Sequence, residues 1–154
     1  MALKQPPVAS TAMLIRKPLA EVFEAFINPD ITTKFWFSQG SGRLEAGKQV
    51  TWRWEMYGFS INVDAKAVEV NSRILIEWPG QSGPTTVEWV FTSRPEGTFV
   101  EVTNRGFHGD DDQKVREALD STGGFTWVLA GAKAWLEHGV QLNLVRDRFP
   151  GGKD

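Results

Sequence analysis

The feature of this sequence that most restricts its fold is a series of short segments in which apolar and polar residues alternate. The stretch VTWRWEMYG places Trp52 and Trp54 on one side and Arg53 and Glu55 on the other. Turn-forming residues separate such segments, which is typical of an antiparallel meander with one apolar face. We expect about five or six strands in this run, with a bend at Gly58. The alternating segments cover residues 50–56, 59–67, 73–78, 87–91 and 100–104.

Helical periodicity is found on both sides of this run of strands. After a first strand within residues 8–18, apolar residues spaced as on one helix face predict a helix over residues 19–27. A second short helix or turn is expected at residues 31–37. Beyond the strands, residues 109–121 predict another short helix, and the longest helix follows the TGG sequence, over residues 125–145.

Together these elements predict an α+β fold in which a curved antiparallel sheet grips one long helix. That helix is the only predicted element able to cover the apolar face of the sheet. The two short helices near the N-terminus would close one end, with a cavity between them and the sheet. We expect a single domain over residues 1–154, with a frayed leader at 1–7 and a tail at 146–154.

Tryptophan is unusually frequent: the chain has seven tryptophans and ten phenylalanines against one tyrosine. Because bicyclic rings rarely interlock without voids, many inward tryptophans favour an enclosed space. Trp52 and Trp54 could form ordinary core, a cavity wall, or a surface that stacks nucleic acid or sugar. The formal net charge of −2 disfavours nucleic acid, which usually requires a basic surface. Both tryptophans are expected on the sheet face that the long helix would cover, which favours the interpretation that they form a cavity wall.

We therefore predict a pocket for a small apolar or aromatic ligand. Asn104 is the only polar residue expected to point inwards from a strand, and its amide can both donate and accept hydrogen bonds. His108 lies in a loop beside the expected mouth of the cavity. The predicted ligand-binding residues are Trp36, Trp52, Trp54, Val63, Trp78, Trp89, Asn104, His108, Phe125 and Leu129.

Several other kinds of site are disfavoured. The absence of cysteine excludes disulfides and thiolate metal sites. Residues 42–49, GRLEAGKQ, resemble a phosphate-binding loop, but Gln49 stands where Mg²⁺ needs Ser or Thr. The acidic run at residues 110–112 lacks EF-hand spacing and suits a helix N-terminus. His108 and His138 lack metal-ligand spacing. We therefore expect no metal and no cofactor.

Catalysis would require an acid, base or nucleophile inside the cavity. The alternation instead places five strand carboxylates on the face opposite the tryptophans. These carboxylates belong to Glu55, Asp64, Glu77, Glu88 and Glu101. No catalytic residue is predicted, and the pattern favours binding over turnover.

The sequence also bears on the cellular location of the protein and on its partners. The N-terminus lacks the apolar core of a signal peptide, and no apolar run is long enough to cross a bilayer, so we expect a cytoplasmic protein without membrane contact. Trp127 falls away from the apolar stripe of the long helix. It would either pack against the short helix at residues 111–120 or form a homodimer or partner contact.

Five stretches of the chain resemble the family of activators of heat-shock-protein-90 ATPase homologues. This family lies within the START, birch-pollen-allergen and polyketide-cyclase superfamily of helix-grip domains. The resemblance spans residues 10–145. The stretches are IRKPLAEVFEAFINPDITTKFWF, GRLEAGKQVTW, VEVNSRILIEW, TTVEWVFTSRPEGTFVEVTNRGF and GGFTWVLAGAKAWLEHG.

The resemblance implies a curved sheet, two short helices and a long C-terminal helix around an apolar pocket. Members often have Gly-Trp at the start of the last helix, where this chain has Gly124-Phe125. They often have a histidine at the end of the last strand, where this chain has Asn104-Arg105. Proton chemistry attributed to that histidine is therefore not expected here.

Three functions follow as hypotheses. The first is a binding module for a small apolar or aromatic ligand. The second is a chaperone-activator-like interaction domain, which would connect the protein to the stress response. The third is an enzyme of the cyclase or hydrolase type. Because the family has no single shared activity, the resemblance supports the fold more than any of these functions.

Overall fold

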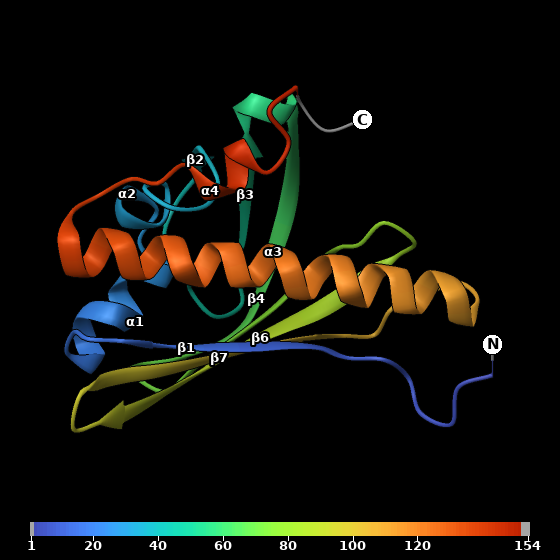
Figure 1. Ribbon diagram of the computed structural model, residues 1–154, viewed down its shortest axis with the longest axis horizontal. Helices are drawn as coiled ribbons and strands as arrows, with labels where there is room; N and C mark the ends of the chain where they lie inside the picture. Colours follow the sequence, from blue (N-terminus) through green and yellow to red (C-terminus); the bar gives the residue numbers. More distant parts are fainter. Residues whose placement is uncertain (1, 152–154) are drawn as a thin grey trace.

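Seven antiparallel strands form one curved sheet in the order β1-β7-β6-β5-β4-β3-β2 (Figure 1). The structure is a computed structural model that describes residues 2–151. The strands are β1 (Ala9–Ile15), β2 (Gln39–Gly40), β3 (Gln49–Trp54), β4 (Phe59–Glu69), β5 (Arg73–Pro79), β6 (Pro84–Arg94) and β7 (Gly97–Arg105). The predicted α+β helix-grip fold is confirmed.

A single long helix, α3 (Asp111–His138), crosses this sheet and packs on β1 and β7 (Figure 1). The short helices α1 (Leu19–Ile27) and α2 (Pro29–Thr32) lie near the C-terminal end of α3. The 3₁₀ turn η1 (Glu55–Tyr57) joins β3 to β4, and the short helix α4 (Leu144–Asp147) follows α3.

The prediction of two separate helices after the last strand is wrong, because α3 is continuous. It begins at a capping box in which Asp110 and Gln113 exchange side-chain and backbone hydrogen bonds. Gly123 and Gly124, which suggested a break, lie inside the helix. The helix ends at His138, earlier than expected, because Gly139 adopts the left-handed conformation that terminates helices.

The second short helix or turn expected at residues 31–37 is found as the end of α2 followed by a turn. Helix α2 ends at Thr32, so Phe35, Trp36 and Phe37 lie in the non-helical segment before β2. Within β4 the pairing with β5 shifts between Ala65 and Ala67. A bulge of this kind moves later side chains to the other face of the strand. The bend at Gly58 is observed, with φ of 68° after the η1 turn.

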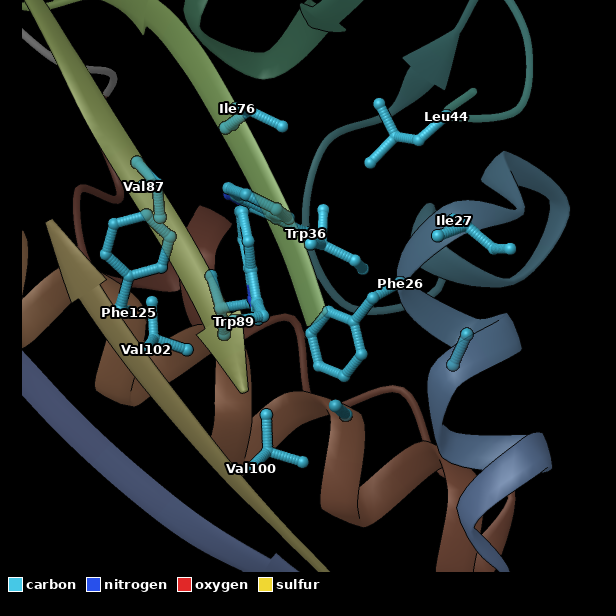
Figure 2. Packing of buried hydrophobic residues seen from close by; sticks show 14 of the residues in the cluster. Phe26, Ile27, Trp36, Leu44, Ile76, Val87, Trp89, Val100, Val102 and Phe125 are labelled. Atoms are coloured by element: carbon cyan, nitrogen blue, oxygen red, sulfur yellow. The ribbon is translucent and has the colours of Figure 1, made fainter. Parts of the chain in front are cut away.

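The buried core lies between the concave face of the sheet, α1 and the C-terminal half of α3. Figure 2 shows Phe26 from α1, Trp89 from β6 and Phe125 from α3 gathered around Trp36. The inward residues of the predicted alternating segments in β3, β6 and β7 are buried. The period of two therefore gave the correct inward face of these strands.

Both predicted ends of the chain make contacts where they are described. The backbone N–H of Leu3, in the expected leader, donates to the Asp111 carboxylate over 3.0 Å. Within the expected tail, Phe149 packs its ring edge-on to Tyr57 at 6.2 Å. Met1 and residues 152–154 lie outside the described residues. Across residues 2–151, no helix has the length and hydrophobicity needed to span a bilayer.

The C-terminal part of α3 is fixed to β1 by a charged contact. Lys133 Nζ donates to the Leu14 carbonyl and to Glu137 Oε2, each over 2.7 Å. The same Glu137 oxygen accepts the backbone N–H of Arg16 over 2.8 Å. Burial raises the pKa of Glu137, but the hydrogen bonds from Arg16 and Lys133 outweigh burial and hold that pKa below its usual value.

We expect Glu137→Gln to destabilise the fold near neutral pH by about 1–2 kcal/mol, because charge-assisted hydrogen bonds are lost. A carboxyl with a lowered folded-state pKa stabilises the fold above its unfolded pKa. That stabilisation disappears as the pH falls through the folded-state pKa. The difference between wild type and variant should therefore shrink at about pH 3. Urea unfolding of wild type and variant at neutral pH and at about pH 3 measures this difference in unfolding free energy.

Glu96→Gln is the matched control, because Glu96 is an exposed carboxylate in the turn between β6 and β7 without a side-chain partner in the described structure. It should leave stability at neutral pH unchanged. Equal unfolding free energies for wild type and Glu137→Gln near neutral pH would show that the contact does not fix α3 to β1.

Candidate functional site

A cavity of about 770 Å³ lies between the N-terminal half of α3 and the sheet. The ends of β3 and β4, the β5–β6 hairpin and residues 145–149 complete its wall. Its volume is within the range of small-molecule sites, roughly 300–1,000 Å³. It lies beside the buried core rather than in its centre.

One part of the wall is aromatic and centres on Trp36. The Trp36 ring lies 6.3 Å from Trp54, 6.0 Å from Trp78 and 5.7 Å from Phe125. Trp78 and Phe125 are stacked at 5.7 Å with 28° between their planes. Tyr57 also lines the wall, and its ring stacks on Phe59 at 6.4 Å. Rigid rings of this kind offer large apolar contact areas at a small cost in side-chain entropy.

The other part of the wall is a hydrogen-bonded network around Asn104, which is 3 % exposed. Its amide donates to Thr85 Oγ1 over 3.0 Å and to the Thr86 carbonyl over 2.8 Å. Its carbonyl accepts from the Ser121 hydroxyl over 2.8 Å. Trp78 Nε1 donates to the same Thr85 oxygen over 3.0 Å. The network joins β5, β6, β7 and α3 at one end of the cavity.

The predicted ligand-binding residues divide into three groups. Five of them line the cavity: Trp36, Trp54, Trp78, Asn104 and Phe125. Four are buried in the core outside the lining: Trp52, Val63, Trp89 and Leu129. His108 is exposed and lies outside the lining, and its Nε2 is 2.7 Å from the Pro84 carbonyl oxygen.

Trp52 and Trp54 therefore have different environments although they share a strand face. Trp52 is 1 % exposed and stacks on Phe37 at 4.5 Å, with 16° between the planes. Trp36 packs against it at 4.8 Å and fills the space beside it. Trp89 is enclosed in the same way, and its Nε1 is a buried nitrogen without a hydrogen-bond partner in the described structure.

The five strand carboxylates expected to face outwards are all outside the cavity lining. Glu88, for example, pairs with Arg73 on the outer face of the sheet. The buried carboxylate of the cavity comes instead from α3: Glu117 is 8 % exposed and accepts a hydrogen bond from the Ser82 hydroxyl. Glu117, Ser121 and Phe125 are spaced by four residues, which places them on one helix face. The predicted break at TGG concealed this pattern.

Residues beyond α3 close one side of the cavity. The Tyr57 hydroxyl donates to the Val145 carbonyl, and burial raises the pKa of Tyr57, so that it remains a donor. Arg148 and Phe149 also line the wall. Sequence reasoning missed this segment because it carries no clear periodicity.

Trp127 lies in the cavity wall and is 40 % exposed. The predicted packing against a separate short helix is wrong, because residues 111–121 belong to the same helix as Trp127. Leu119 and Phe59 are also exposed apolar residues of the wall. The homodimer or partner contact remains a prediction. Among residues 2–151, no group of His, Cys, Asp or Glu side chains could hold a metal ion.

Asn104→Leu tests the polar network. The substitution leaves the Ser121 hydroxyl and the Thr86 carbonyl without their Asn104 partner, and we expect it to cost about 2–3 kcal/mol of stability. Ser121→Ala removes one hydrogen bond beside the open cavity, where water can replace it, and should cost about 1 kcal/mol. Chemical denaturation measures both. An Asn104→Leu protein as stable as wild type would show that the network contributes nothing to the fold.

Solved structures with the same fold are found among proteins from several bacteria. A protein of Staphylococcus saprophyticus is 33 % identical, over 88 % of this chain and 95 % of its own, with a TM-score of 0.75. The Aha1 dimer from Colwellia psychrerythraea is 18 % identical, over 86 % of this chain and 97 % of its own, with a TM-score of 0.72. DynU16, described as a putative protein of the dynemicin biosynthetic locus, is 19 % identical, over 89 % of this chain and 49 % of its own, with a TM-score of 0.78.

Comparison with curated protein sequences gives no match. The sequence does match a protein family, described as Activator of Hsp90 ATPase homolog 1-like protein, over residues 16–131. The matched region runs from the residue after β1 to Gly131 in the C-terminal half of α3 and includes the polar network. The predicted resemblance is confirmed, and the chain belongs to this family.

Proposed function

We propose that this protein binds a small, mostly apolar ligand in the cavity between α3 and the sheet. The observation that carries the proposal is a cavity of about 770 Å³ with an aromatic wall and a hydrogen-bonded polar end. Small-molecule sites typically combine these features: apolar walls supply affinity, and a few polar groups orient the ligand.

Two adjacent glycines in α3 support this proposal. Glycine inside a helix costs about 1 kcal/mol relative to alanine, so its presence calls for a reason. A Cβ at Gly123 or Gly124 would meet no atom within 4 Å, so neighbouring packing does not require glycine there. Both residues line the cavity. The bare backbone leaves this side of the cavity open to an occupant.

Gly131 lies on the same helix, but here close packing leaves little room for a side chain. A Cβ there would lie 3.1 Å from Phe35 Cβ and 3.3 Å from its carbonyl oxygen. This glycine allows α3 to approach the segment that carries Trp36. The contrast separates a packing role at Gly131 from an open cavity wall at Gly123 and Gly124.

We expect Gly124→Ala to stabilise the protein by about 0.5–1 kcal/mol, because alanine favours the helix and clashes with nothing. Gly124→Leu should fold but reduce the affinity for N-phenyl-1-naphthylamine by at least about tenfold, because the side chain occupies the cavity. Fluorescence titration with this neutral probe measures the affinity, and thermal unfolding measures the stability.

Lys114→Leu is the control for a bulky apolar residue on α3 outside the cavity lining, and it should leave probe affinity unchanged. Gly131→Ala should lack the stability gain of Gly124→Ala. If wild type does not bind the probe, or if Gly124→Leu binds it as tightly as wild type, the cavity is not the site.

A second function is favoured by the family match itself. The family is described by activation of the Hsp90 ATPase, and one structural relative is an Aha1 dimer. The exposed rings of Phe59 and Trp127 offer a surface for a protein partner. This hypothesis expects a rise in the steady-state ATPase rate of a bacterial Hsp90 when the protein is added, and a smaller rise with Trp127→Ala. An unchanged rate at saturating protein would exclude it.

The enzyme hypothesis has weaker support. Acid–base catalysis commonly combines an acid and a base with different pKa values in one site. Among the described lining residues, Glu117 is the only charged side chain that is buried. The arrangement is better suited to orienting a ligand than to moving protons between two groups.

A further inference from the structure

The position of Glu117 gives information about the ligand itself, and this inference rests on the proposed ligand-binding function. Glu117 lies on α3 one turn before Ser121, at the polar end of the cavity. Its Oε1 accepts a hydrogen bond from Ser82, in the β5–β6 hairpin. Its Oε2 has no hydrogen-bond donor in the described structure.

A carboxylate held in this way receives only one hydrogen bond from the described residues of the protein. Buried ionised groups are normally paired with an opposite charge or saturated with hydrogen bonds. One hydroxyl donor satisfies only part of the acceptor capacity of Glu117. The remaining oxygen is not sealed among protein atoms, and Glu117 belongs to the cavity wall. An occupant of the cavity can therefore supply the missing donor.

The other charges of the wall lie at its solvent-exposed rim. Arg116 and Asp120 are exposed, and Gln81 donates to Asp120 over 3.3 Å. Arg148 is also exposed and lies 4.5 Å above the ring of Phe149. Water and salt screen charges at such positions far more than a buried charge. Glu117 should therefore dominate the electrostatic preference inside the cavity.

The aromatic part of the wall favours the same sign of ligand charge. The faces of tryptophan and phenylalanine rings carry negative electrostatic potential and attract cations. Trp78 and Phe125 are the nearest part of this wall to the polar network, because Trp78 donates to Thr85 and Phe125 follows Ser121 by one turn. A protonated nitrogen placed here would meet both a carboxylate and ring faces.

We propose that the ligand is an arylalkylamine, a planar aromatic ring carrying an aliphatic amine that is protonated at neutral pH, with the nitrogen on Glu117 Oε2 and the ring against Trp78. The apolar body of the ligand would extend along the bare backbone at Gly123 and Gly124. The pairing completes the hydrogen bonding of a buried carboxylate that the protein leaves incomplete.

Three naphthalene probes of similar shape test the charge preference: 2-naphthylmethylamine, 2-naphthylmethanol and 2-naphthoate. At neutral pH they are respectively a cation, a neutral molecule and an anion. For wild type we expect the amine to bind at least about tenfold tighter than the alcohol, and the carboxylate to bind weakest. Isothermal titration calorimetry measures the three affinities.

Glu117→Gln keeps the shape of the side chain and removes its charge. The amine should lose its advantage, binding within about twofold of the alcohol, whereas the affinity for the alcohol should change little. Asp112→Asn is the matched control, because it removes an exposed carboxylate of the same helix that lies outside the cavity lining. It should preserve the wild-type order of affinities.

The outcomes separate the two proposals. If wild type binds the alcohol or the carboxylate as tightly as the amine, the inference is overturned while ligand binding stands. If none of the three probes binds although N-phenyl-1-naphthylamine does, the inference is overturned and ligand binding stands, whereas both proposals fail if none of the four probes binds. A preference for the amine that survives in Glu117→Gln would also overturn the role of Glu117. Because the order of affinities in wild type is decisive by itself, the test does not depend on the variant folding.

Discussion

The packing of the Trp36 ring is the interaction on which the rest of the structure depends. This ring lies between the sheet and α3, 4.8 Å from Trp52 and 5.9 Å from Trp89 on its buried side. Its other neighbours, among them Trp54 and Phe125, form the cavity wall. One indole therefore contacts both the buried core and the residues of the cavity wall.

Polar contacts at both ends of α3 explain how this cavity stays open. Apolar side chains that face empty space lose dispersion contacts with neighbouring atoms. Neighbouring elements therefore tend to move together and fill the space. Near its N-terminal end, α3 is joined to β7 through Ser121 and Asn104. Near its C-terminal end, Lys133 and Glu137 bond to the backbone of β1 and the residue that follows it. These directional bonds fix the distance between helix and sheet.

Much of the fold, and the place of five of the ten predicted ligand-binding residues in the cavity lining, could be read from local patterns. Alternation in β3, β6 and β7 gave the inward face of each strand, and thus the inward position of Trp54 and Asn104. The break expected at Gly123 was wrong because local propensity was outweighed by packing along a continuous helix. That error hid Glu117, whose spacing from Phe125 has meaning only on one uninterrupted helix. Residues near Val145 were missed because their place in the wall depends on contacts with Tyr57, 88 residues away in sequence.

The sequence by itself determined which residues turn inwards, since period-two alternation and one buried face leave a strand little choice of orientation. It also determined the α+β class, because only one predicted helix could cover the sheet. Whether an inward ring belongs to the core or to the cavity wall was decided by the tertiary structure alone. Trp52 and Trp54 follow the same pattern, yet Trp52 is enclosed by the rings of Trp36 and Phe37 whereas Trp54 is part of the cavity lining. Alternation indicates on which face of a strand a residue lies. A cavity forms only where the surrounding elements do not pack against one another, and local alternation does not indicate this.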